Sequence, residues 1–287
     1  MKKGWKRFWM ICGSVFLAGV FLCLVSLGMG FSREKLKAVY PYGIGITDSY
    51  SLMYDWDDDW DDDAVRNQEA VSGTFTKDYP HARELDLEMA GGELYIQYYD
   101  GDTIRVEAEN LNPELQFRSY VDGETFCIRT SKKVWKENGL KDEEAGRVTV
   151  MLPQGSMEEI SLKVGAGILQ ADELYGSTIE IETGVGEAVV RGIEAYELEM
   201  QCGTGTIEAE CAAMGDISID CGIGSVQLMI GGAETDYQEE ISCGIGHTRV
   251  GSREYHGLGK EVNGNHHGQW ELEVECGIGD VTIDFKE

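Results

Sequence analysis

The sequence predicts an all-β fold: a single-stranded β-helix or β-roll solenoid of about seven rungs with a ~19-residue repeat, following one N-terminal transmembrane helix. Two observations predict the stacked part. A Gly-x-Gly phrase recurs with its first glycine at 165, 184, 203, 222, 244 and 277, at spacings of 19, 19, 19, 22 and 33 residues. Hydrophobic side chains also alternate on both sides of each phrase. A nearly fixed period is typical of repeat architectures, whose units bury a core only by stacking.

Each repeat is expected to contain two strands that meet at a corner. In one repeat, Ile217 and Ile219 precede the phrase, and Val226 and Leu228 follow it. Alternation with period two gives each strand one buried face. The alternation shifts by one residue across the second glycine, and glycine can adopt the positive φ that a corner needs.

Three sets of residues are assigned by this pattern. The corner glycines, expected to be structural, are Gly165, Gly167, Gly184, Gly186, Gly203, Gly205, Gly222, Gly224, Gly244, Gly246, Gly277 and Gly279. The residue between each pair of glycines is expected to point into the core: Ala166, Val185, Thr204, Ile223, Ile245 and Ile278. A column of cysteines just before the first glycine is expected to line the corner: Cys202, Cys221, Cys243 and Cys276.

Stacked coils explain the period better than the rival fold does. An earlier, weaker copy of the repeat places Leu85, Leu87 and Met89 before Gly91-Gly92. Parallel strands of neighbouring coils would lie about 4.8 Å apart, and crossover chirality favours a right-handed coil. A sandwich of antiparallel hairpins also accounts for the alternation, but not for the constant period.

The N-terminal segment has the pattern of a membrane anchor. Residues 1–7 include four cationic side chains, and the next 25 residues, 8–32, have no charged side chain. About 20 apolar residues span a bilayer. A cleavable signal peptide has a shorter apolar region and a small-residue cleavage site, of which Gly28-Met29-Gly30 is a poor version. We therefore expect residues 8–31 to anchor the chain in the cell membrane by a single pass, with residues 1–7 in the cytoplasm and most of the chain outside.

The rest of the chain divides into a spacer and a β body. The expected spacer covers 32–75, and its segment 55–63 has seven aspartates in nine residues. Such a run repels itself and would hold the body off the membrane; a low-affinity site for a divalent cation is the alternative. The body is expected at 76–287, with an irregular N-terminal part at 76–153 and regular repeats at 159–287.

The longest interval between repeats, from Cys243 to Cys276, is expected to contain an inserted loop at about residues 251–269. Histidines gather in and before this loop, and we interpret them as solvated rather than metal-binding. The strand 281–285 is expected to form the C-terminal end of the stack.

The chain resembles the bacterial putative-adhesin family of unknown function over about residues 77–285. The resemblance lies in Leu85-x-Leu87-x-Met89 with its glycine pair, in Val148-x-Val150-x-Leu152-Pro153 leading into Ile160-x-Leu162, and in the serial Gly-x-Gly phrases. It implies a membrane-anchored β-solenoid at the cell envelope. It supplies no catalytic residues.

Composition and motifs exclude several classes of function. The net charge of −28 and the pI near 4.4 argue against nucleic acid and anionic membrane surfaces as partners. The sequence has no P-loop, dinucleotide-binding fingerprint, zinc-protease motif or nucleophile elbow. We therefore expect no catalytic residues and no cofactor.

The cysteine column leaves three interpretations open. Cysteine can act as a small buried hydrophobe at a narrow corner, which is the favoured interpretation. Disulfides between neighbouring coils suit an extracellular location, although a stack separates the Cβ atoms slightly more than a disulfide allows. A thiolate metal site is the third, but no Cys-x-x-Cys spacing supports it.

Carboxylates recur at the outward positions of the first strand in each repeat. Stacking would align them as two columns on one face: Glu180, Glu182, Glu199, Asp220, Glu240, Glu273 and Glu275. The favoured interpretation is a solubilising face. The alternative is a surface that binds divalent cations or cationic groups of the envelope.

The leading functional hypothesis is a non-enzymatic, membrane-anchored β-solenoid that acts outside the cell as an adhesin-like or envelope-scaffold protein. The second is an envelope-stress or signalling accessory that binds another membrane protein. A polysaccharide-cleaving β-helix enzyme is the third, and it is disfavoured because its carboxylates should converge in a cleft rather than spread along a face.

Overall fold

The computed structural model describes residues 68–131, 145–212, 215–264 and 268–286. The expected anchor at 8–31 and the acidic segment at 55–63 lie outside these ranges. Within them, no helix is long and apolar enough to cross a membrane. The regular elements there are β-strands and two single-turn 3₁₀ segments, η2 (Pro113–Leu115) and η3 (Glu234–Asp236). The predicted all-β, solenoid-like fold is confirmed.

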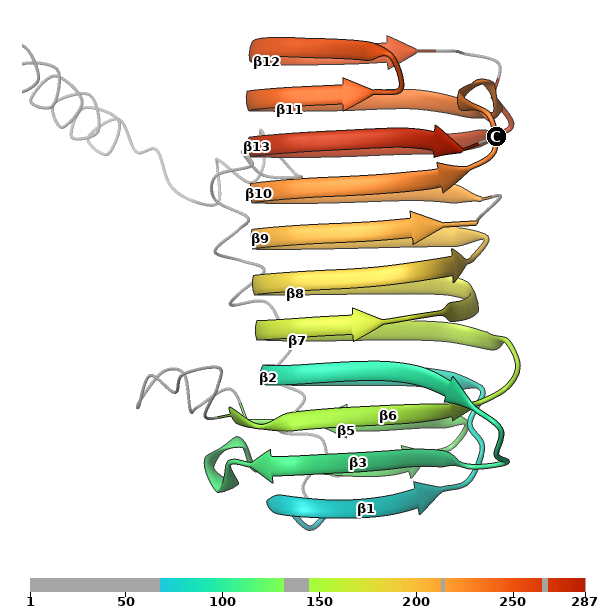
Figure 1. Ribbon diagram of the computed structural model, residues 1–287, viewed down its shortest axis with the longest axis vertical. Helices are drawn as coiled ribbons and strands as arrows, with labels where there is room; N and C mark the ends of the chain where they lie inside the picture. The colour runs from blue at the N-terminus through green and yellow to red at the C-terminus, as the bar shows by residue number, and fades with distance from the viewer. Residues whose placement is uncertain (1–67, 132–144, 213–214, 265–267, 287) are drawn as a thin grey trace, which may run out of the picture. The chain divides into compact units, whose positions relative to one another are not determined.

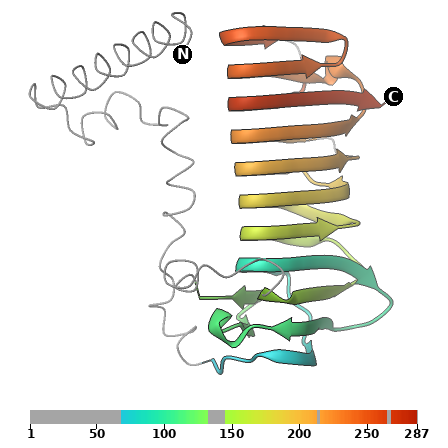
Figure 2. The ribbon, with the colours of Figure 1, turned by 60° about the vertical axis from the view of Figure 1, so that its left-hand side comes forward.

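The strands form one continuous hydrogen-bonded sheet that wraps around the core (Figure 1). They are β1 (Gly73–Tyr79), β2 (Glu84–Tyr99), β3 (Ile104–Leu111), β4 (Arg118–Asp122), β5 (Thr125–Arg129), β6 (Arg147–Pro153), β7 (Met157–Ala171), β8 (Leu174–Glu194), β9 (Glu197–Cys211), β10 (Asp216–Gly231), β11 (Tyr237–Val250), β12 (Arg253–Gly264) and β13 (Trp270–Lys286). The parallel part of the stack runs in the order β2, β7, β8, β9, β10, β13, β11. Figure 2 shows these strands one above another.

Each long strand is one rung folded at its Gly-x-Gly phrase or, in β2, at the equivalent Ala90-Gly91-Gly92. We call the residues before the phrase the first limb and those after it the second limb. In β10 the first limb buries Ile217 and Ile219, and the second limb buries Val226 and Leu228. The two inner faces supply the core, as the alternation predicts. Neighbouring rungs pair without slippage at the phrase, since Gly224 is opposite Gly205 in β9 and Gly279 in β13.

The second glycine of the phrase forms the corner, as the phase shift predicts. Gly167, Gly186, Gly205, Gly246 and Gly279 have φ between +138° and +159°. A Cβ atom built at Gly205 would lie 1.9 Å from the carbonyl oxygen of Gly186 in the rung before it. Both the backbone conformation and the contact between rungs therefore require glycine at this corner.

The C-terminal end of the stack differs from the expectation in two ways. The interval predicted as an inserted loop holds β12, which pairs antiparallel with β11 and forms the last strand of the sheet. The strand predicted to be terminal, β13, instead lies between β10 and β11 and pairs in parallel with both. The chain thus skips one rung position after β10, builds the β11–β12 hairpin, and returns to fill the gap.

The N-terminal end is closed by shorter strands. β5 pairs in parallel with the first limb of β2, and β6 with its second limb. β4 then pairs antiparallel with β5, while β3 and β1 extend the sheet beyond β6. Phe117 and Phe126 are fully buried in this cap. Tyr79 donates a hydrogen bond to the Ser119 carbonyl at 3.0 Å, so a buried polar group at this end is satisfied.

Candidate functional site

The outer face of the first limbs presents two columns of carboxylates. The register of β8, β9, β10, β13 and β11 aligns Glu180, Glu199, Ser218, Glu273 and Glu240 in one column. It aligns Glu182, Gln201, Asp220, Glu275 and Ser242 in the other. The sequence-predicted acidic residues therefore share one surface. Glu182 is an exception in its exposure, because only 5% of its surface is accessible.

Two cations compensate these columns toward the N-terminal end of the stack. Lys163 of β7 places its Nζ 2.9 Å from Glu180 Oε1 and 3.6 Å from Glu182 Oε2. Burial lowers the pKa of Lys163, while the hydrogen bond to Glu180 and the charge of Glu182 raise it by more. Asp86 and Glu88 of β2 continue the two columns beyond β7. Arg129 of β5 is hydrogen-bonded to Asp86 and lies 3.8 Å from Glu88. The sequence argument missed both cations. Lys163 was recoverable, because it stands in β7 at the repeat position that Glu182 holds in β8.

Toward the C-terminal end, the carboxylates act on one another. Burial raises the pKa of Glu273 above its ordinary value, and the charges of Glu275, Glu240 and Glu271 raise it further. Among the described side chains, no group of three or more His, Cys, Asp or Glu residues could hold a metal ion. Binding of divalent cations by this face remains a prediction.

Replacing Glu273 with glutamine should stabilise the fold most at neutral pH. A carboxyl whose pKa is raised in the folded state destabilises that state once it ionises, so the penalty is absent below the unfolded pKa and grows as pH rises through the raised value. The gain in melting temperature of Glu273→Gln over the parent should therefore shrink as pH falls from 7 toward 4.

The matched control for this experiment is Glu208→Gln on the second limb. Glu208 lies 3.9 Å from Arg191, so removing its charge should give no stabilisation at any pH. A Glu273→Gln gain that is the same at both ends of the pH range would contradict the assignment.

The cysteine column forms a line of buried thiols. Cys202, Cys221 and Cys276 follow one another in register and are at most 4% exposed. These three, together with Cys127 and Cys211, are not joined in disulfides. Contact with Cys221 lowers the pKa of Cys202, whereas contacts with Cys202 and Cys276 raise the pKa of Cys221. The geometry of these described thiols agrees with packing as small apolar side chains. Cys243 is opposite Cys276 in the register.

The residues between the paired glycines point outward, which corrects the expectation that they line the core. Val185, Ile223 and Ile245 are 46%, 44% and 51% exposed. The chain reverses direction at the second glycine, so the residue before it lies on the convex side of the bend. We call this column the corner ridge; in stack order it consists of Ala166, Val185, Thr204, Ile223, Ile278 and Ile245.

The last parallel rung contains an ion pair with a buried carboxylate that the sequence argument missed. Glu239 occupies the inward position that Leu272 holds in the next rung, and its side chain is inaccessible to solvent. Arg253 at the start of β12 donates a hydrogen bond from Nη2 to Glu239 Oε1 at 2.6 Å. The same guanidinium also pairs with Glu234 of η3. An acidic residue at an otherwise apolar repeat position was the available signal.

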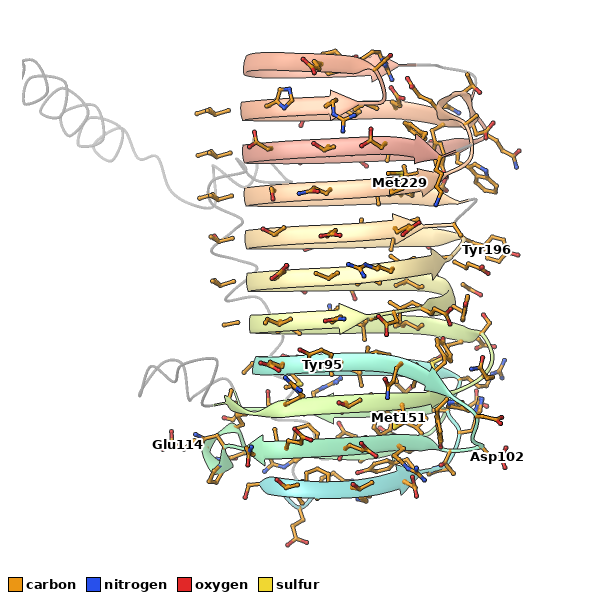
Figure 3. The ribbon with its side chains drawn as sticks, in the orientation of Figure 1. Tyr95, Asp102, Glu114, Met151, Tyr196 and Met229 are labelled. Atoms are coloured by element: carbon orange, nitrogen blue, oxygen red, sulfur yellow. The ribbon has the colours of Figure 1, made fainter. Side chains whose placement is uncertain are left out.

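A groove of about 450 Å³ crosses the second limbs of β8, β9, β10 and β13. Met229, labelled in Figure 3, is one of its lining residues. Four of its five charged lining side chains are paired with each other: Arg191 lies 3.9 Å from Glu208, and Lys286 lies 3.6 Å from Glu210. The fifth, Asp284, pairs with Arg249 of β11, outside the lining. The groove therefore has mixed charge, unlike the acidic first-limb face.

Several solved structures are similar to part of the chain. A putative cell adhesion protein from Clostridium sporogenes is 15% identical, with 75% of this chain and 100% of that chain covered and a TM-score of 0.42. A putative adhesin from Bacteroides fragilis is 14% identical, covering 75% and 98%, with a TM-score of 0.32. A putative lipid binding protein from Parabacteroides distasonis is 13% identical, covering 75% and 98%, with a TM-score of 0.30.

No curated protein matches the chain. The model of the Toastrack DUF4097 family matches residues 82–287, from the start of the first full rung to the last residue of the chain. This range includes every parallel rung, the corner glycines and the terminal hairpin. The chain belongs to the Toastrack DUF4097 family.

Proposed function

We propose that the protein is a non-catalytic, membrane-anchored β-solenoid that holds its body outside the cell and binds an envelope component there, as an adhesin-like or scaffold protein. One observation carries the proposal: outward side chains repeat in register over successive rungs. Such a stack offers extended faces of repeated chemistry, which suit repeated contacts with a large partner.

The N-terminal sequence supports the location. Its 25 uncharged residues, 8–32, are long enough to span a bilayer, and the preceding residues are cationic. The acidic segment 55–63 would keep the body away from an anionic membrane surface. The body would then project outside the cell on a short spacer.

The topology is tested by adding protease to intact cells from which the wall has been stripped. We expect the body to be released, because the cleavable spacer lies on the outer side of the membrane. A body that stays protected until the membrane is lysed would show that the orientation is reversed.

An accessory protein that binds another membrane protein is the second candidate. The corner ridge favours it, because three aliphatic side chains that are 44–51% exposed form an apolar surface suited to a protein partner. Complexes of the full chain, isolated in detergent, would distinguish the two. A stoichiometric membrane-protein partner supports the accessory role, and retention on cell-wall material supports adhesion.

A further inference from the structure

The corner ridge is a continuous apolar strip at its C-terminal end. Ile223, Ile278 and Ile245 are adjacent in the register of β10, β13 and β11. Ile223 and Ile245 are 44% and 51% exposed, and Ile278 is half-buried. At about 4.8 Å per rung, the three isoleucines span about 10 Å, and the ridge from Val185 to Ile245, which includes Thr204, spans about 19 Å. It is therefore long enough to contact several side chains of a partner.

Packing does not require an aliphatic residue at this position. Thr204 occupies the same position in β9, opposite Val185 on one side and Ile223 on the other. Threonine, valine and isoleucine share the β-branched shape that extended backbone favours. The strand geometry is thus satisfied by a polar β-branched residue, and the aliphatic character of the ridge needs another explanation.

Carboxylates border the ridge on both sides. On the first limbs, Asp220 and Glu275 lie in register beside it, and both are exposed. On the second limbs, the column two residues beyond the ridge holds Glu187, Thr206, Ser225, Asp280 and His247 in stack order. Its two carboxylates, Glu187 and Asp280, are exposed. An apolar strip with acidic borders is complementary to aliphatic side chains flanked by cations.

We propose that the corner ridge docks a cationic amphipathic protein segment, in which lysine or arginine side chains flank aliphatic ones. The inference deepens the proposed function and rests on its premise that the outer surfaces of the stack bind partners. A second copy of the chain is disfavoured as the occupant, because two ridges face to face would bring their carboxylate borders together. An anionic bilayer is disfavoured for the same reason.

The test measures binding of a labelled peptide with alternating leucine and lysine to the full chain in phosphatidylcholine nanodiscs, with empty nanodiscs subtracted. The ridge variant is Ile223→Thr, Ile278→Thr and Ile245→Thr combined, which keeps β-branching as Thr204 does. The border variant is Glu275→Gln with Asp280→Asn. The matched control is Tyr196→Thr, since Tyr196 is 72% exposed and projects from the turn between β8 and β9, away from the ridge (Figure 3).

We expect the ridge variant to weaken peptide binding by about tenfold or more, because it removes the apolar contact. The border variant should also weaken it and reduce its salt dependence. The Tyr196→Thr control should bind like the parent, and a peptide with alternating serine and lysine should bind all variants weakly. Unchanged melting of the ridge variant, followed by circular dichroism, shows that the fold is retained.

Three results would overturn the proposal. Equal binding by the parent and the ridge variant would mean that net charge alone attracts the peptide. Self-association of the parent that the ridge variant loses would identify a second copy as the occupant, and ridge-dependent binding to phosphatidylcholine vesicles would identify a membrane. These binding results do not depend on which side of the membrane the body occupies. The outcome of the protease experiment, which tests the proposed location, is therefore independent of the outcome of the peptide-binding experiment.

Discussion

Alanine at Gly167 should destabilise the stack far more than alanine at Gly155. The two glycines have nearly the same φ, +138° and +140°, so the backbone strain of a side chain is closely matched. Their surroundings differ: a Cβ at Gly167 would lie 2.0 Å from the Gly92 carbonyl oxygen, whereas a Cβ at Gly155 meets nothing within 4 Å. The difference between the two variants therefore isolates the contact between rungs.

Strain at a glycine-only φ costs about 1–3 kcal/mol, which is the loss expected for Gly155→Ala. At Gly167 the clash is with backbone, which cannot rotate away as a side chain can. The rungs β2 and β7 must therefore separate locally, which breaks backbone hydrogen bonds between them. We expect a total loss of about 4 kcal/mol or more, in the range reserved for severe defects.

The two losses are measured by urea denaturation of the full chain followed by circular dichroism, with the parent in the same series. Similar midpoints for Gly167→Ala and Gly155→Ala would mean that rung spacing does not depend on the glycine column. A partial transition confined to the N-terminal rungs would still support the assignment, because a stacked fold can lose its rungs locally.

The repeat period and its alternation were enough to predict the stack, its corners and its register. Each follows from local rules: period two identifies the buried face, and the phase shift at the second glycine identifies the corner. The first glycine of the phrase is structural for a different reason, because it is not among the glycines with positive φ. At position 244, glycine is required by the lack of space, since a Cβ atom built there would lie 2.5 Å from the Gly277 carbonyl oxygen.

The order of the last rungs could not be predicted, because it depends on pairing between distant segments. The repeats of β10, β11 and β13 contain the same Cys-Gly-Ile-Gly phrase. The local sequence therefore does not distinguish the observed order, in which β13 pairs between β10 and β11, from the order along the chain. The identity of β12 was recoverable. Its Gly257-Leu258-Gly259 is a Gly-x-Gly phrase in a strand of opposite direction, with Leu258 opposite Ile245.

The corner ridge was misassigned because period-two alternation does not continue through a bend. Ile223 lies two residues from Cys221, and a straight strand would put both on the same buried face. Cys221 is fully buried, while Ile223 is 44% exposed. The side-chain direction at a corner depends on how the backbone turns there, and this information becomes available only with the three-dimensional structure.

Replacing Arg253 with methionine should be among the most damaging single changes at the C-terminal end. Glu239 has no accessible side-chain surface, and its hydrogen-bonded cation is Arg253, whose side chain is 34% accessible. Removing the cation leaves the charge of the buried Glu239 carboxylate uncompensated, at a cost of about 3–5 kcal/mol. The matched control is Arg249→Met in the partly exposed pair with Asp284, whose side chains are 31% and 33% accessible. Loss of that pair should cost about 0–1 kcal/mol.

The double variant Glu239→Leu with Arg253→Met separates the charge from the packing. Leucine already stands at the equivalent position in the neighbouring rung, because Leu272 is opposite Glu239. Replacing a buried ion pair with apolar side chains of similar size is often neutral or stabilising, so the double variant should recover most of the stability that Arg253→Met loses. Thermal and urea unfolding of the parent, both single variants and the double variant complete the cycle. An Arg253→Met loss no larger than that of Arg249→Met would show that water reaches Glu239 and that the pair does not seal this end of the core.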